Sequence, residues 1–148
     1  MRTPAIRKKL RIASGRIRLA SLRTQRRVAL ALGLRRLYIA RVARIIRRSG
    51  LFDADWYLEV NADVSASGKD PITHYDRFGD REGRQPMPFF DPAFYRASAK
   101  GRVGSHNALV HYLCEGRFRR ASPSAWFDVA FYLAQNRDVS RSGEEPLL

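Results

Sequence analysis

Two aspartates, Asp53 and Asp55, form the side-chain pattern in this sequence that comes nearest to a site of chemistry. Two carboxylates at this spacing can share a divalent cation with the phosphate oxygens of a nucleotide sugar. The later segments Asp91-Pro92-Ala93 and Asp128-Val129-Ala130 keep only the first aspartate of the pair. An aspartate just before an apolar helix can accept hydrogen bonds from the free amides of its first turn. We therefore interpret Asp53, Asp91 and Asp128 as helix caps and predict no metal site at Asp55.

The remaining candidates for catalysis or metal binding are two histidines and the single cysteine. His74 and His111 occupy equivalent positions, each followed by a tyrosine, and no cluster of cysteines or carboxylates accompanies them in the sequence. Cys114 has no identifiable base to activate it. Glycine-rich phosphate loops and Gly-x-Ser-x-Gly motifs are absent. We predict packed, hydrogen-bonded histidines, an inert thiol, and no catalytic, cofactor-binding or metal site.

These residues belong to an internal repeat. Phe52, Phe90 and Phe127 each begin a Phe-Asp motif, at spacings of 38 and 37 residues (90 − 52 and 127 − 90). A period of this size is typical of stacked helical repeats. The positions that we assign to the framework of the repeat are Phe52, Asp53, Tyr57, His74, Tyr75, Phe90, Asp91, Tyr95, His111, Tyr112, Phe127, Asp128 and Tyr132.

Each unit is predicted to consist of a helix, a loop, a second helix and a turn. In the first unit, a short helix begins after Asp53 and ends at Asn61, and a loop follows over residues 62–68. Pro71 suits the first turn of the second helix, which Gly79 is positioned to end. One such unit cannot bury its apolar face alone, so neighbouring units must stack. The predicted apolar faces of the two helices are Trp56, Tyr57 and Val60, and Ile72, Tyr75 and Phe78.

The later units depart from the first. In the second, the basic segment over residues 96–104 replaces the middle of the unit. This segment is the best candidate for a specific contact with a partner, because loops are where repeats vary to bind other molecules. Random drift of the sequence explains the difference equally well. The third unit matches the first as far as Pro146, and the chain then reaches Leu148 before a second helix. We expect the chain to be the N-terminal part of a longer protein, or to need a partner at its C-terminal end. The predicted divisions are a leader over 1–50 and repeats over 51–88, 89–125 and 126–148.

Charge is distributed very unevenly along the chain. Residues 1–50 hold 16 of the 28 Lys and Arg residues and none of the 14 Asp and Glu residues, so this segment carries +16 and residues 51–148 carry −2. The boundary falls near Ser49-Gly50. The net charge of +14 therefore belongs to a basic leader followed by a nearly neutral domain.

The leader is predicted to be a helix over residues 22–48, broken or kinked at Gly33. Its apolar stripe is imperfect, because Arg35 falls within it. The residues of the stripe are Val28, Leu32, Ile39, Val42 and Ile46. Two interpretations are of similar weight: a helix that lies on an anionic membrane surface, or a solvated helix that packs on the repeats or on another copy of the chain. Nucleic-acid binding ranks third, because the leader offers only Tyr38 for base stacking.

The arginines predicted to contact an anionic surface are Arg26, Arg27, Arg35, Arg36, Arg44, Arg47 and Arg48. If they do, replacing Arg35, Arg36, Arg47 and Arg48 by glutamine should weaken binding to vesicles. A single cysteine suits a reducing compartment. The apolar run over residues 28–34 is followed at once by Arg35-Arg36, which does not fit a secretory signal, and no run approaches the roughly 20 apolar residues of a membrane span. We expect a cytoplasmic protein, or one on the inner face of the cytoplasmic membrane.

The consensus of the three copies is Phe-Asp-x-x-x-Tyr-Leu-x-x-Asn-x-Asp-Val, then Gly-x-x-Pro-Leu, His-Tyr, Gly and Glu-Gly-Arg-x-Pro. It resembles a repeat of bacterial surface-polysaccharide proteins, whose copies precede or flank glycosyltransferase or sulfotransferase domains. The resemblance covers residues 51–148, departs from the pattern in the second copy, and includes no catalytic domain. It implies a setting in glycan assembly, and it assigns catalysis to no residue of this chain.

We therefore predict an all-α protein with a basic helical leader followed by stacked helix–loop–helix repeats. The predicted function is that of a non-catalytic interaction or targeting module of a surface-polysaccharide system, without a cofactor. Its expected partners are a glycan-assembly enzyme or another copy of the chain, and an anionic membrane surface. The alternatives are the N-terminal part of a glycosyltransferase whose catalytic domain lies beyond residue 148, and a basic nucleic-acid-associated protein.

Overall fold

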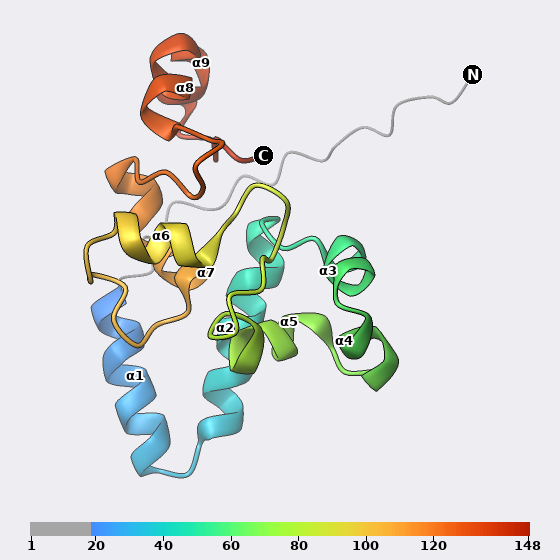
Figure 1. Ribbon diagram of the computed structural model, residues 1–148. Coiled ribbons are helices and arrows are strands. Elements are labelled where there is room, and N and C mark those ends of the chain that lie inside the picture. Colours follow the sequence, from blue (N-terminus) through green and yellow to red (C-terminus); the bar gives the residue numbers. More distant parts are fainter. Residues whose placement is uncertain (1–18) are drawn as a thin grey trace.

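The computed structural model describes residues 19–148 (Figure 1). All the secondary-structure elements in that range are helical, which confirms the predicted all-α class. Residues 1–18 of the predicted leader lie outside the described residues. Within the described range the only extended pairings are two isolated bridges, Met87 with Phe90 and Ser124 with Phe127. No helix in this range is long and apolar enough to cross a bilayer.

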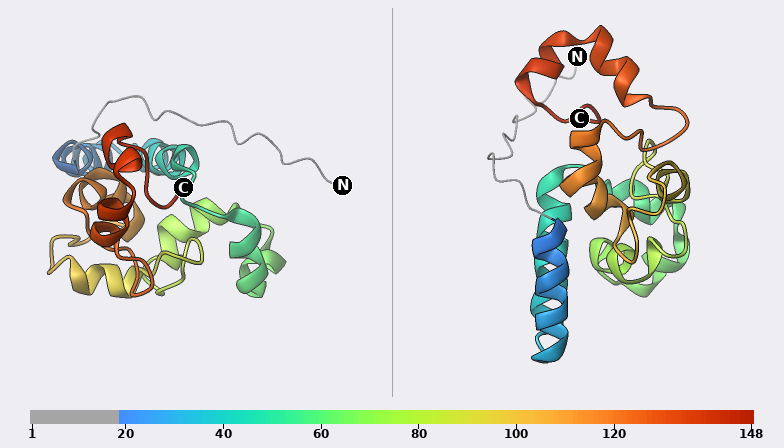
Figure 2. Two further views of the ribbon diagram at one scale, coloured as in Figure 1. Left: turned by 90° about the horizontal axis from the view of Figure 1, so that it is seen from above. Right: turned by 90° about the vertical axis from the view of Figure 1, so that its left-hand side faces the viewer.

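The basic leader forms a helical hairpin. Helix α1 (Leu19–Ala31) and helix α2 (Arg35–Ser49) lie antiparallel and side by side, joined by a tight turn (Figures 1 and 2). Gly33 in this turn has φ of 67°, a left-handed conformation that glycine adopts without the steric cost of a Cβ. The break at Gly33 is confirmed, but the chain reverses its direction there instead of continuing as one kinked helix.

Helix α2 belongs to the core of the domain. Its side chains Val42, Ala43 and Ile46 are buried, and α2 packs against helices α5 (Pro71–His74) and α7 (Ala108–His111). The interpretation that the leader packs on the repeats therefore holds for α2. Only the second half of the predicted stripe is buried, because the reversal at Gly33 removes Val28 and Leu32 from this face. The boundary near residue 50 is one of composition, and the hydrophobic core crosses it.

The first unit contains three helices, and the predicted loop over residues 62–68 is wrong. That segment forms helix α4, which Gly68 ends in a left-handed conformation with φ of 63°. Val64 is buried, and this packing explains why a short polar segment becomes helical. The helices of the unit are α3 (Ala54–Val60), α4 (Ala62–Ser67) and α5, which continues as the π-helical turn η1 (Tyr75–Gly79).

Two predicted apolar faces are also only partly correct. Tyr57, Ile72 and Tyr75 are buried, but Val60 and Phe78 are exposed. Phe78 lies within the π-turn, whose i→i+5 hydrogen bonds change the angular position of the residues after Tyr75 relative to an α-helix. Asn61 ends α3 without adopting the left-handed conformation (φ −124°), and its Nδ2 donates a hydrogen bond of 2.8 Å to the Tyr57 carbonyl.

The second unit has a non-helical segment in its middle, but residues 96–98 of the predicted basic segment belong to helix α6 (Pro92–Ser98). The third unit docks onto the second. Residues 99–107 connect helices α6 and α7, with Val103 buried among them. Glu145 accepts a hydrogen bond of 2.7 Å from the Tyr112 hydroxyl and lies 3.4 Å from the Arg117 guanidinium. The elements of the two units are α6 (Pro92–Ser98), α7, the π-turn η2 (Tyr112–Gly116), the 3-10 turn η3 (Arg117–Arg119), α8 (Val129–Gln135) and α9 (Arg137–Ser142).

Candidate functional site

The two histidines considered as candidates for catalysis or metal binding, His74 and His111, are hydrogen-bonded to tyrosines. The Tyr57 hydroxyl lies 3.1 Å from His74 Nδ1, and the Tyr95 hydroxyl lies 2.7 Å from His111 Nδ1. Burial lowers the pKa of His74, so its imidazole is neutral near pH 7. Packed, hydrogen-bonded histidines are thus confirmed at both positions.

The aromatic residues of the repeat framework make matching contacts. Tyr57 and Tyr75 pack edge to face with ring centroids 6.0 Å apart, and Tyr95 and Tyr112 do the same at 5.7 Å. Each Phe-Asp phenylalanine lies against the tyrosine five positions later. The centroid distances are 5.1 Å for Phe52 and Tyr57, 5.5 Å for Phe90 and Tyr95, and 5.3 Å for Phe127 and Tyr132. These residues form matching aromatic clusters in the first two units.

The three recurring aspartates cap helices. Asp53 accepts a hydrogen bond from the Trp56 amide, Asp91 from the amides of Ala93 and Phe94, and Asp128 from the Phe131 amide. Asp55 is exposed. Among the described residues no three His, Cys, Asp or Glu side chains are gathered as a metal site would require. The prediction that these aspartates cap helices is confirmed.

Cys114 is a buried thiol on the π-turn η2. Burial, together with the charge of Glu115, raises its pKa to about 11. The thiolate is the reactive form of cysteine, so Cys114 is protonated and unreactive near neutral pH.

The turn of the hairpin carries a group of exposed apolar side chains. We call residues 28–37 the hairpin tip. Its apolar side chains are between 43% and 65% exposed, which is unusual for five neighbouring aliphatic residues: Val28, Leu30, Leu32, Leu34 and Leu37. Arg35 and Arg36 lie exposed among them, and Arg27 directly precedes them. The tip therefore carries exposed apolar side chains with exposed arginines among them.

The structure divides the seven arginines predicted to contact anions into two groups. Arg26 donates a hydrogen bond of 3.1 Å to the Ser105 hydroxyl, and Arg47 pairs with Asp70 at 3.0 Å. These two are thus already engaged within the protein. The other five are exposed: Arg27, Arg35 and Arg36 at or beside the tip, and Arg44 and Arg48 towards the opposite end of α2.

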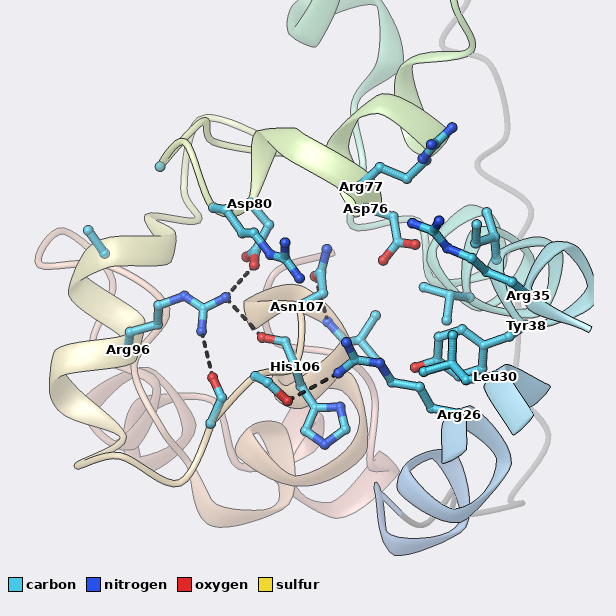
Figure 3. Close-up of a pocket in the computed structure, with 18 residues that line it drawn as sticks. Arg26, Leu30, Arg35, Tyr38, Asp76, Arg77, Asp80, Arg96, His106 and Asn107 are labelled. Carbon is cyan, nitrogen blue, oxygen red and sulfur yellow. Dashed lines mark hydrogen bonds and ion pairs between the residues drawn. The ribbon is translucent and has the colours of Figure 1, made fainter. Parts of the chain in front are cut away.

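A polar cavity of about 760 Å³ lies between the hairpin and the loop over residues 99–107 (Figure 3). The hairpin contributes Arg26, Arg35 and Tyr38 to its lining, and η1 contributes Asp76. Asn107, at the end of the loop, completes this part of the lining. Figure 3 shows the Tyr38 hydroxyl and the Arg26 guanidinium directed towards the cavity from the hairpin, and the Asp76 carboxylate directed towards it from η1. The basic segment and the repeats therefore build one cavity together.

Asp80 connects the two units at the edge of this cavity. Its buried carboxylate pairs with Arg96 and accepts a hydrogen bond of 2.8 Å from the Ala108 amide at the start of α7. Arg96 also donates to the carbonyls of Gly104 and His106. Sequence reasoning missed this cluster. The available signal was a departure from the repeat, because Arg96 stands where the other copies have Leu58 and Leu133.

Asp76 faces the cavity as a mostly buried carboxylate. Burial, and next the neighbouring Asp80 charge, raise its pKa to about 6, against the lowering effect of Arg26, Arg81 and Arg77. The other polar groups that face it across the cavity are Arg35, Tyr38 and Asn107. No ion pair or hydrogen bond to its carboxylate occurs within the described part of the chain. Asp76 is thus mostly charged near pH 7, and the nearby arginines do not fully offset the cost of its burial.

Replacing Asp76 by asparagine is expected to stabilise the protein near neutral pH by about 2 kcal/mol. Since the folded-state pKa is raised, the stability from this group is fully present below the unfolded pKa near 4 and is lost as the pH rises through about 6. Urea unfolding between about pH 4 and pH 7 should show the two proteins converging in acid. Glu59→Gln, on the exposed surface of α3, is the control. A gain that does not change with pH would contradict the titration of Asp76.

No protein-family model, no curated protein and no solved structure matches this chain.

Proposed function

We propose that the protein is a non-catalytic targeting module whose hairpin tip binds an anionic membrane surface. The observation that carries this proposal is the group of exposed leucines among arginines at residues 28–37. Exposed apolar side chains insert at the boundary between headgroups and acyl chains, and each arginine near an anionic surface contributes about 1 kcal/mol. The segment over residues 1–50 contains no acidic residue to oppose this attraction.

The non-catalytic part of the proposal is supported by the side chains that could otherwise do chemistry. His74 and His111 are hydrogen-bonded to tyrosines, Asp53 caps a helix, and Cys114 carries a raised pKa. Each of these groups already has a structural contact or lacks the reactive form. This arrangement favours a role in binding.

We further propose that the units over 51–88, 89–125 and 126–148 are copies of one repeat that binds other proteins. The matching tyrosine–histidine pairs of the first two units support this interpretation. In those units Tyr57 and Tyr95 are fully buried, whereas Tyr132 of the third is half-buried and its neighbour Phe131 is 66% exposed. A protein partner would cover this partly exposed aromatic face. The resemblance to repeats of surface-polysaccharide proteins suggests a glycan-assembly enzyme at the cytoplasmic face of the membrane.

Vesicle binding tests the membrane proposal. Replacing Arg27, Arg35 and Arg36 by glutamine should weaken partitioning onto vesicles that contain phosphatidylglycerol by roughly 100-fold at low salt, because about 3 kcal/mol of attraction is removed. Partitioning is measured by co-sedimentation over a lipid titration. Leu32→Gln combined with Leu37→Gln should also weaken binding, since it removes apolar side chains that would insert.

The matched control replaces three exposed arginines of α2 outside the tip, Arg41, Arg44 and Arg48, by glutamine. This variant loses the same charge but should bind nearly as well as the unchanged protein at moderate salt. Equal losses in the two triple variants would show that only net charge matters and would overturn the role of the tip. Absence of binding to anionic vesicles by the unchanged protein would overturn the membrane proposal itself.

A further inference from the structure

The cavity between the hairpin and the loop over residues 99–107 is large enough for a small molecule. Its volume of about 760 Å³ lies within the range of roughly 300–1,000 Å³ that is usual for ligand sites. Its lining comes from segments far apart in the chain, including α1, α2, η1 and the loop before α7. A ligand there would contact both the basic hairpin and the units that follow it (Figure 3).

The electrostatic balance of the cavity favours an anion. Five arginines and two aspartates line it: Arg26, Arg35, Arg77, Arg81 and Arg96, and Asp76 and Asp80. Asp80 and Arg96 neutralise each other as an ion pair. Arg77 lies over the Phe78 ring at 5.2 Å and points away from the cavity in Figure 3. Three guanidinium groups then remain against one carboxylate. Guanidinium groups match the planar, bidentate geometry of phosphate and carboxylate groups.

Two polar groups of the lining have no hydrogen-bond partner within the described residues. One is a hydrogen-bond donor and the other is an acceptor. The Asn107 Nδ2 is a buried donor at the cavity wall. The Asp76 carboxylate is an acceptor, directed towards the cavity in Figure 3. Buried polar groups are normally satisfied by a partner. A ligand that satisfied both would need an acceptor oxygen and a hydrogen-bond donor.

We propose that this cavity binds a small hydroxylated anion, in which an oxyanion group contacts the arginines and a hydroxyl group donates to Asp76. An oxyanion without a hydroxyl would meet the Asp76 charge and gain nothing from it. A neutral polyol would leave the arginines without an anionic partner. A hydroxylated phosphate or carboxylate, such as a sugar phosphate or a sugar acid, combines both groups in one molecule.

Several contacts hold the cavity wall in place before a ligand arrives. Arg26 donates to Ser105 at 3.1 Å, and Arg96 donates to the His106 carbonyl at 2.9 Å. Both contacts fix the loop that carries Asn107, and Asp80 holds the first turn of the following helix α7. Side chains fixed in this way lose little conformational entropy on binding. The site is therefore organised by the fold.

The test uses the full chain in solution without lipid, so that its result is independent of the membrane proposal. Glucose 6-phosphate, glucuronate, inorganic phosphate and glucose are titrated by calorimetry and by amide shifts in NMR spectra. Glucose 6-phosphate or glucuronate should bind at least tenfold more tightly than either phosphate or glucose. The stronger of the two identifies the oxyanion as phosphate or carboxylate.

Three single variants locate the binding. Arg35→Gln should weaken the binding of the hydroxylated anion and of inorganic phosphate about tenfold each, because one charge-assisted contact is lost. Asp76→Asn should weaken the binding of the hydroxylated anion alone. The binding of inorganic phosphate should stay unchanged or become stronger, because the substitution removes a repulsive charge. Arg36→Gln, next to Arg35 but outside the cavity lining, should change neither. Equal effects of Arg35→Gln and Arg36→Gln would overturn the site, as would no saturable binding of any probe up to about 10 mM.

Discussion

Gly116→Ala is expected to destabilise the protein by about 3 kcal/mol, which for a domain of this size lowers the melting temperature by roughly 6–12 °C. A Cβ at this position would lie 2.1 Å from the Tyr95 hydroxyl oxygen and 3.0 Å from Tyr95 Cζ. The tyrosine cannot move away freely, because its hydroxyl is hydrogen-bonded to His111 at 2.7 Å. The gain of roughly 0.5–1 kcal/mol that alanine usually brings to a helix is too small to compensate.

The equivalent glycine of the first unit gives a sharper version of this experiment. A Cβ at Gly79 would lie 2.2 Å from the Tyr57 hydroxyl oxygen but 3.4 Å from Tyr57 Cζ. Removal of the hydroxyl alone should therefore relieve the clash. In a double-mutant cycle, Tyr57→Phe should recover most of the stability lost in Gly79→Ala, whereas Tyr95→Phe should recover only part of the loss in Gly116→Ala. Urea unfolding measures all six variants. Equal stability of Gly79→Ala and the unchanged protein would contradict the close contact.

Asp80→Ala is expected to destabilise the protein by about 3 kcal/mol. The substitution leaves Arg96 without its carboxylate partner and leaves the Ala108 amide, at the start of α7, without an acceptor. Both groups lie where the first and second units meet. The effect is therefore expected on the stability of the whole domain, measured by urea unfolding with two probes whose transitions should coincide.

Asp80→Asn separates the charge of this residue from its hydrogen bond. Burial raises the pKa of Asp80 more than the Ala108 amide and the Arg96 guanidinium together lower it. The charged form is thus disfavoured by the fold on balance, and a neutral amide that still accepts from Ala108 should cost clearly less than alanine. The exposed pair Arg47 and Asp70 supplies the control, since Arg47→Gln should cost under about 1 kcal/mol. Equal losses in Asp80→Asn and Asp80→Ala would show that the ion pair dominates.

The features that could be predicted from the sequence depend on a few neighbouring residues. Asp53, Asp91 and Asp128 cap helices because their side-chain oxygens reach amides two or three residues away. Gly33 interrupts the leader because a left-handed residue ends a helix wherever it occurs. The recurrence of Phe, Tyr and His marked the framework positions, and in the first two units the structure gathers these residues into matching aromatic clusters.

The features that could not be predicted depend on tertiary contacts. Helix α4 has six residues of loop-like composition, and it forms because Val64 is buried. Val42 and Ile46 belong to the predicted apolar stripe, but the sequence did not specify that the repeats are the surface that buries them. The cavity requires the hairpin to fold back beside η1 and the loop over residues 99–107, and no local pattern specifies that arrangement. Similarly, the partners Asp80 and Arg96 belong to different units.

The hairpin also sets the distance between its tip and the rest of the domain. Helix α2 has 15 residues, which corresponds to a length of about 22 Å, and its far end is packed into the core between α5 and α7. The tip lies at one end of the molecule, and α8 and α9 lie at the other (Figures 1 and 2). A surface that held the tip would therefore be separated from the third unit by a rigid spacer. Trp126, which is 90% exposed just before α8, belongs to that third unit and would be held away from the surface together with it.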